Sequence, residues 1–333
     1  MRKTTQSMLL VVLCTGIWAE KLAEFEWLSH SSPIYSCCEN RYLLADKKSG
    51  QVKLFDLQTG RESACFGRIG EGPGEFLMML RNVILDGDRV WADSVGRLTV
   101  MDLDGRLIRD IRHDNWERLI GRVGENLLVE YHSSNSDRTA MVRKGTLCDE
   151  TFKPIKLLFE SERKMDVTKW EIFHADVVIS FDTGHVLVAD PKKQGELSLL
   201  DSNGELIRTI RHKFEILPIS AEDRRAMEKE KMDEFKKSSP QLAAQIKIIV
   251  PEHYPLLNRM FLDSSHILVS TFKKMNKNTE VLFFDFEGRN LGKKSFPDEA
   301  LVYFHEGYFY YFKNNDETDL MELHRLSVGE PNP

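Results

Sequence analysis

The chain has 333 residues, of which 41% are hydrophobic and 29% are charged. This composition provides apolar side chains for one large β domain or two ordinary domains. Lysine and arginine number 46 against 52 aspartate and glutamate residues, so the formal net charge is −6. Proteins that bind nucleic acid normally present a basic face, and this balance argues against that class.

The amino terminus has the pattern of an export signal. Arg2 and Lys3 precede the apolar stretch "MLLVVLCTGIWA" (8–19), and polar, acidic sequence begins at Glu20. The stretch is too short to span a bilayer, which takes about 20 apolar residues. We therefore predict a cleavable signal peptide over 1–19, an exported protein (periplasmic or extracellular) and no integral membrane span. A lipoprotein anchored at Cys14 is disfavoured, because the residue before it is the large Leu13.

Internal repeats dominate the rest of the chain. "GRLIRDIR" (105–112) and "GELIRTIR" (204–211) agree at six of eight positions, and a third copy covers 43–60. Each repeat has an apolar strand ending in Ala-Asp, a polar turn, an alternating strand ending in Asp, a glycine turn and another strand. Weaker copies occupy 126–145, 266–288 and 307–329.

The turn glycines of the six copies indicate propeller blades. Their spacings are 45, 40, 59, 84 and 41 residues, and a four-stranded blade takes about 40–45. The glycines concerned are Gly60, Gly105, Gly145, Gly204, Gly288 and Gly329.

An insertion explains the longest spacing. Residues 219–249 lack strand alternation, Ser220 and Asp223 resemble a capping box, and Ser239-Pro240 is typical of a second helix start. We predict two helices inserted between blades four and five. The other long spacing is interpreted as a loop over 160–173.

The predicted fold is an all-β six-bladed β-propeller whose N-terminal strand closes the last blade. The first blade is predicted at 34–38, 42–45, 52–56 and 62–66, whereas only three strands follow residue 300. The segment "KLAEFEWLSH" (21–30) alternates like a half-buried strand, and it can supply the missing strand and protect the open edge. One domain over 20–329, a tail over 330–333 and a monomer are expected.

The segment "FGRIGEGPGEF" (66–76) raises the question of a ligand cradle. A phosphate-binding loop has the pattern G-x-x-x-x-G-K-[ST], but this loop has no lysine, and Glu71 and Glu75 would repel phosphate. Glycine and proline are accounted for by a crossover between blades one and two. Propellers commonly bind ligands on the face with such crossovers, so Arg68, Glu71 and Glu75 are candidate ligand-binding residues.

These motifs also carry a resemblance to a known family. "FGRIGEGPGEF" resembles the signature of bacterial exported six-bladed β-propellers related to the NHL-repeat family, and "VPEHYPLLNRMFLD" (250–263) is similar to the same group. The resemblance covers roughly residues 22–329. It implies the propeller fold and an exported location, and it implies no activity.

Other polar residues allow two interpretations each. Asp46, Asp93 and Asp190 follow Ala at strand ends and could converge on calcium, but binding of their own turn amides is favoured. His253 and Tyr254, in the rigid "PEHYP" loop, are the remaining candidate ligand-binding residues. Four cysteines follow the leader, either free or partly paired as a disulfide. These are Cys37, Cys38, Cys65 and Cys148.

The functional expectation is a non-enzymatic module that uses one face of the ring to bind an unknown protein, small molecule or glycan. The sequence contains neither a G-x-S-x-G nucleophile elbow nor Cys/His spacing typical of zinc, so no catalytic residues, metal site or cofactor are predicted. The alternative is a lactonase, other hydrolase or lyase with calcium or zinc at the mouth of the central channel.

Overall fold

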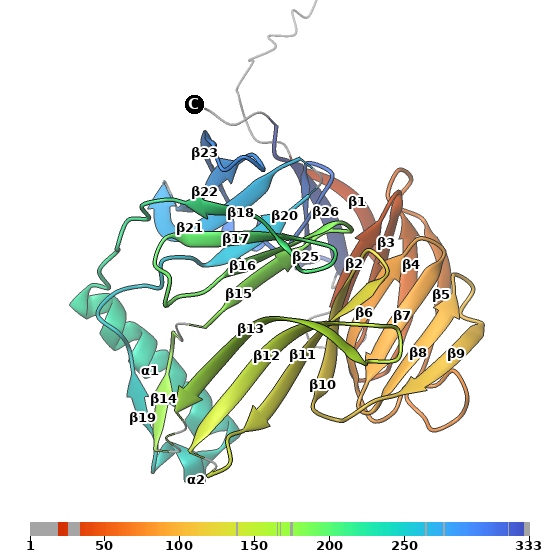
Figure 1. Cartoon of the computed structure of the whole chain (residues 1–333), viewed down its shortest axis with the longest axis horizontal. Coiled ribbons are helices and arrows are strands. Elements are labelled where there is room, and N and C mark those ends of the chain that lie inside the picture. Colours follow the sequence, from red (N-terminus) through yellow and green to blue (C-terminus); the bar gives the residue numbers. More distant parts are fainter. Residues whose placement is uncertain are drawn as a thin grey trace, which may run out of the picture.

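Six four-stranded antiparallel sheets follow one another around a ring, as the computed structural model shows (Figure 1). The structure describes residues 19–25, 34–137, 139–164, 166, 168–173, 176–263, 265–275, 277–318 and 320–329. The predicted leader, apart from Ala19, and the predicted tail 330–333 lie outside these ranges.

The blades run in chain order, with each blade starting from its innermost strand. Blade one consists of β2 (Ile34–Cys38), β3 (Arg41–Ala45), β4 (Val52–Asp56) and β5 (Glu62–Phe66). Blade two consists of β6 (Leu80–Asp86), β7 (Arg89–Ser94), β8 (Arg97–Asp102) and β9 (Leu107–Arg112). Blade three consists of β10 (Glu117–Val123), β11 (Asn126–Ser134), β12 (Ala140–Cys148) and β13 (Pro154–Lys164). Blade four consists of β15 (Val178–Phe181), β16 (His185–Ala189), β17 (Glu196–Asp201) and β18 (Leu206–Arg211). Blade five consists of β20 (Arg259–Leu262), β21 (Ile267–Met275), β22 (Asn278–Phe284) and β23 (Asn290–Phe296). Blade six consists of β24 (Tyr303–His305), β25 (Tyr308–Asn315), β26 (Leu320–Ser327) and β1 (Ala19–Phe25). The predicted six-bladed fold is confirmed, and the strands of blade one match their predicted bounds closely.

The N-terminal strand closes the ring, as predicted. β1 pairs antiparallel with β26, so the outermost strand of blade six comes from the opposite end of the chain. Lys21 reinforces this pairing by donating to Glu322 at 3.0 Å. Ala23 of β1 is buried with Tyr42 and Leu44 of blade one. The observed strand covers 19–25 rather than 21–30, and residues 26–30 lie outside the described ranges.

The core is divided among the blade interfaces. Each of six clusters of buried apolar side chains lies between two neighbouring blades, including the interface between blade six and blade one. A central strand therefore packs apolar side chains on both of its faces. This explains why β7 and β8 are buried along nearly their whole length instead of alternating.

The turn before the outermost strand depends on an aspartate as much as on glycine. In blade two, Asp102 accepts hydrogen bonds from the amides of Asp104 and Arg106, and Gly105 has φ +79°. In blade three, Asp149 accepts from the amide of Thr151 at 2.8 Å, and Phe152 adopts φ +65° in the position of the glycine.

Two of the predicted turn glycines are therefore wrong. Gly145 lies inside β12, where the ring of Phe159 occupies the space that a side chain would need. Gly329 follows β26, and no blade turn exists there because the next strand of that blade is β1. A search for glycine missed the blade-three turn, since the hydrogen bonds of Asp149 stabilise it without one.

The predicted loop over 160–173 is also partly wrong. β13 continues to Lys164, and Lys169–Glu171 form β14, which pairs in parallel with β19 (Lys247–Ile249). The loop was predicted only from the long spacing, and the last residues of β13 are mostly exposed to solvent. β14 and β19 tie the connection between blades three and four to the insertion.

The helical insertion follows β18 and precedes β20, between blades four and five as predicted. It contains α1 (Ala221–Ser238) and α2 (Pro240–Ala243), and the Ser220 hydroxyl accepts from the Asp223 amide at 3.0 Å to cap α1. No residue of α1 is buried, so the helix lies on the surface. In the described part of the chain, neither helix has the length and apolarity needed to cross a bilayer.

We predict that the Gly60→Ala substitution destabilises the ring closure. A Cβ atom on Gly60 would lie 1.6 Å from the carbonyl oxygen of Leu22 in β1, at φ +67°. Gly87 has φ +57° and open space around it, so Gly87→Ala is the matched control for backbone strain. Gly87→Ala should cost about 1 kcal/mol of unfolding free energy, and Gly60→Ala about 1–3 kcal/mol more. Urea denaturation measures both, and equal losses would contradict the prediction.

We also predict unequal reactivity of the cysteines. All four described cysteines are free, with Cys65 exposed and Cys37 and Cys148 buried. Burial raises the pKa of the Cys37 thiol, which lowers the thiolate fraction that reacts. With iodoacetamide at pH 8, Cys65 should be modified first, and Cys37 and Cys148 only after unfolding, as peptide mass spectrometry would show. Simultaneous modification of the three in the folded protein, or a disulfide among them, would refute this.

Candidate functional site

The connections between successive blades emerge at one end of the ring, here called the crossover face. Each connection leaves an outermost strand and enters the innermost strand of the next blade. Because the four strands of a blade alternate in direction, every such connection starts and ends at the same face. The residues predicted to bind a ligand lie in two of these connections. Arg68, Glu71 and Glu75 follow blade one, and His253 and Tyr254 follow blade four.

The glycine-rich segment forms a loop that is held by hydrogen bonds between its own residues. Arg68 Nε donates to Glu75 Oε1 at 2.6 Å, and the Gly72 amide donates to Glu75 Oε2 at 2.8 Å. These bonds lower the pKa of Glu75, with the Gly72 amide the largest cause. Phe76 is fully buried, whereas Glu71 is exposed on the surface. Arg68 and Glu75 therefore partner each other, and a role in ligand binding for these three residues stays a prediction.

His253 and Tyr254 lie where the insertion rejoins the ring. The Ile219 amide donates to the Glu252 carbonyl at 2.8 Å, and the Tyr254 amide donates to the Leu217 carbonyl at 3.0 Å. The two ends of the insertion are thus paired with each other just outside blade five. This pairing holds Tyr254 at a fixed position on the crossover face.

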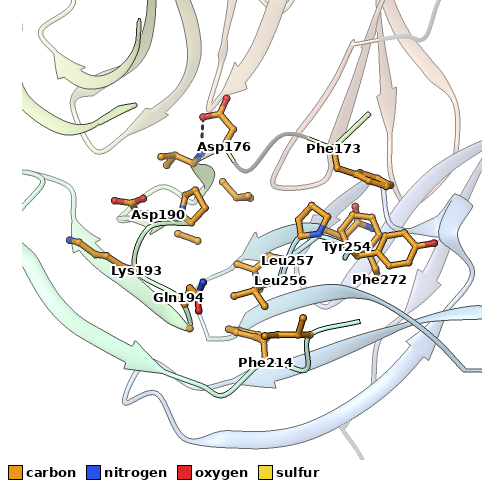
Figure 2. Close-up of a pocket in the computed structure, with 18 of the residues that line it drawn as sticks. Phe173, Asp176, Asp190, Lys193, Gln194, Phe214, Tyr254, Leu256, Leu257 and Phe272 are labelled. Atoms are coloured by element: carbon orange, nitrogen blue, oxygen red, sulfur yellow. Dashed lines mark hydrogen bonds between the residues drawn. The ribbon is translucent and has the colours of Figure 1, made fainter. Parts of the chain in front are cut away.

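A cavity of about 630 Å³ lies beside Tyr254, between blades four and five (Figure 2). Its lining comes from the connection before β15, the β16–β17 hairpin, the segments on both sides of the insertion, and β21. The lining residues are Ile172, Phe173, Asp176, Val177, Val178, Ala189, Asp190, Pro191, Lys193, Gln194, Gly195, Glu196, Leu197, Phe214, Ile216, His253, Tyr254, Pro255, Leu256, Leu257, Asn258 and Phe272.

Three aromatic rings from distant segments form one wall of this cavity. Phe173 lies edge-on to Tyr254 and Phe272, with ring centroids 5.4 and 5.2 Å apart, and Tyr254 stacks on Phe272 at 5.0 Å. Burial raises the pKa of the Tyr254 phenol, so this group is neutral at physiological pH. The wall can hold an apolar or aromatic group of a ligand.

Polar groups lie at the opposite side of the cavity (Figure 2). Asp176 accepts from the Ser161 hydroxyl at 3.1 Å and lies 3.3 Å from Arg143 Nη1, so its charge is balanced within the protein. Lys193 and Gln194 are exposed, and the described residues provide no ion-pair partner for Lys193. The cavity therefore combines an apolar wall with free hydrogen-bonding groups at its rim.

The sequence identified only part of this cavity. His253 and Tyr254 line it, whereas Arg68, Glu71 and Glu75 lie in the crossover after blade one and do not. Phe173 and Phe272 were missed because they are nearly one hundred residues apart in the chain. No local spacing signals their contact, and a single sequence could not have paired them.

The three aspartates considered for calcium have different environments. Asp46 and Asp190 accept hydrogen bonds from amides of their own turns, as favoured from the sequence. Asp93 is fully buried, where Arg81 Nη2 and His113 Nε2 each lie 3.0 Å from its Oδ1. The interpretation of Asp93 as a turn residue is therefore wrong, because its carboxylate links blade two to the connection that leads into blade three.

The metal-dependent alternative requires several ligands at one place. Within the described ranges, histidine, cysteine, aspartate and glutamate side chains form no group of three or more that could hold a metal ion. The calcium- or zinc-dependent enzyme thus has no supporting observation in this part of the protein.

Asp93 should contribute far more to stability than Asp190. Asp93→Ala leaves the partly buried Arg81 guanidinium without its carboxylate, and loss of one partner of a buried pair costs about 3–5 kcal/mol. Asp190→Ala removes one turn hydrogen bond and should cost about 1 kcal/mol. Urea denaturation of the two variants compares them directly. Losses of the same size would show that the buried network is not an important source of stability.

Comparisons with known proteins agree with this architecture. Residues 34–237 match a family described as 6-bladed beta-propeller. A solved structure of a Bacteroides fragilis protein described as exported is similar over 95% of this chain and 95% of its own, with 13% identity and a TM-score of 0.55. This likeness shows the fold alone.

Other solved structures are less similar. A chain of a nidogen–laminin complex has 12% identity, covers 78% of this chain and 79% of its own, and has a TM-score of 0.40. The Neurospora crassa Pan2 WD40 domain has 9% identity, coverages of 95% and 96%, and a TM-score of 0.39. Neither of these two TM-scores supports an inference about the present chain. A comparison with curated proteins found no match. Because the family match extends over more than half of its residues, the chain belongs to the 6-bladed beta-propeller family DUF5128.

Proposed function

We propose that this protein is an exported binding module that holds its ligand in the cavity between blades four and five, without catalysis. The single observation that carries the proposal is the cavity itself, which joins an aromatic wall of Phe173, Tyr254 and Phe272 to a polar rim. Export is supported by the leader pattern over 1–19 and by the likeness to a Bacteroides fragilis protein described as exported.

The walls of the cavity are held in place from outside. Arg143 of β12 donates to the Val177 carbonyl at 2.8 Å, and its ion pairs reach both Glu130 and Asp176. The Ile172 amide donates to the Ile249 carbonyl at 3.0 Å, which continues the β14–β19 pairing. A ligand that enters does not need to order these segments, so less binding free energy is lost to conformational entropy.

The lining specifies the kind of ligand that fits. An aromatic or branched aliphatic group would contact the aromatic wall and the side chains of Leu256 and Leu257. A polar or anionic end would then lie near Lys193 and Gln194 at the rim. A small amphipathic molecule meets both requirements within the volume of about 630 Å³.

The probe 8-anilinonaphthalene-1-sulfonate has this combination of aromatic rings and an anionic end. We expect it to bind the purified mature protein with enhanced fluorescence. Tyr254→Ala, which removes one ring of the wall, and Gln194→Trp, which fills the mouth, should each weaken binding at least 5-fold. Fluorescence titration measures the dissociation constants, and circular dichroism checks the fold.

The matched control is Ile155→Ala, because Ile155 is 55% exposed on β13, away from the cavity. Binding of the dye to this variant should equal that of the unmodified protein. If Ile155→Ala loses binding while both cavity variants keep it, the dye binds exposed surface and the proposal is wrong. Binding by both cavity variants with unchanged affinity would refute it equally.

A further inference from the structure

Trp116 places its indole in solvent on the crossover face, between blades two and three. The residue is 69% exposed, yet its backbone is fixed on both sides. Its amide donates to Asp114 Oδ1 at 2.9 Å, and its carbonyl accepts from the His132 amide at 3.2 Å. Binding residues are found disproportionately on loops held by a rigid scaffold, and tryptophan is enriched at interfaces.

A second cavity, of about 720 Å³, lies beside this indole. It is separate from the cavity between blades four and five, with no residue in common. Its lining combines Trp116 and Tyr131 with carboxylate, hydroxyl and amino groups, among them Glu117, Ser133 and Lys144. Apolar and polar groups therefore lie together in one small cavity.

Hydrogen-bonding capacity remains free at this surface. The Asp114 amide donates to Glu117 Oε2 at 2.8 Å, and Asp114 Oδ1 accepts from Trp116. Each carboxylate thus uses one oxygen to hold the loop. Asp114 Oδ2, Glu117 Oε1 and the Ser133 hydroxyl have no hydrogen-bond partner among the residues that the structure describes.

We propose that this cavity is a carbohydrate-binding subsite centred on Trp116. The C–H face of a pyranose ring packs on an indole, while the hydroxyls around its edge need donors and acceptors. The indole provides the platform, the free carboxylate oxygens accept from sugar hydroxyls, and the Ser133 hydroxyl can donate. Lys144, whose ammonium lies 3.1 Å from Glu160 Oε2, has further N–H groups that can donate. Two carboxylates at the platform disfavour a nucleotide, whose base could stack but whose phosphates would be repelled.

This subsite does not depend on the proposed function of the first cavity. Its ligand chemistry is different, and none of its residues contributes to the aromatic wall of Tyr254. The two proposals can therefore fail separately. Binding of the anionic dye tests the first cavity, and binding of neutral sugars tests the second.

The test is a glycan array probed with the fluorescently labelled mature protein, followed by isothermal titration calorimetry with the best-bound glycan. We expect the unmodified protein to retain at least one glycan. Trp116→Ala should weaken that binding at least 10-fold, and Trp116→Phe should weaken it less, because the phenyl ring keeps part of the platform. Thermal unfolding should stay unchanged, since the indole is mostly exposed.

Trp170→Ala is the matched control. Trp170 is also partly exposed, at 39%, but it packs against Phe235 of α1 and lines neither cavity. Its loss should leave glycan binding within 2-fold. An array on which the unmodified protein retains nothing above the Trp116→Ala background would overturn the proposal. Equal binding by Trp116→Ala, or preferential binding of adenosine monophosphate at this cavity, would also overturn it.

Discussion

Pairing between β1 and β26 is the interaction on which the rest of the structure depends. Each blade exposes two apolar faces, and both are covered only when the blade has a neighbour on either side. A ring of six sheets meets this requirement if its first and last blades also meet. Strand β1 contributes to that contact, because it belongs to the sheet of blade six and its Ala23 packs against blade one beside Tyr310 and Leu323. Closure therefore converts six weakly stable sheets into one cooperative core.

The closed ring also determines where ligands can bind. Its interfaces are filled by buried side chains, so binding surfaces arise from the connections on the crossover face. Between blades four and five, the insertion widens this face, and the paired ends of the insertion hold Tyr254 over the resulting cavity. Between blades two and three, the shorter connection holds Trp116 outward through Asp114. Two cavities of different chemistry thus share one rigid support.

Blade three and the connection after it show why the sequence pattern gave a wrong turn glycine and a wrong loop. Its turn combines Asp149 with Phe152 at positive φ, so the glycine that marks the other turns is missing. The carboxylate of Asp149 stabilises the turn by hydrogen bonds, and this offsets the strain at Phe152. Similarly, β14 has only three residues and pairs with a strand from the insertion. A strand this short, with its partner far along the chain, has no periodicity to detect.

The sequence by itself determined the repeat, the number of blades and the place of the insertion, because each depends on local strand pairing and turn chemistry. It also indicated the closing strand, because the last blade has only three strands after residue 300, although the pairing joins opposite ends of the chain. Tertiary structure alone decided which side chains meet. Phe173, Tyr254 and Phe272 come from three connections or strands that the ring brings together. Asp93 meets Arg81 on the neighbouring strand of blade two and His113 in the connection to blade three, and no spacing in the sequence signals these contacts. Contacts of this kind depend on distances across the ring rather than along the chain, so the sequence indicated His253 and Tyr254 but not the cavity that they line.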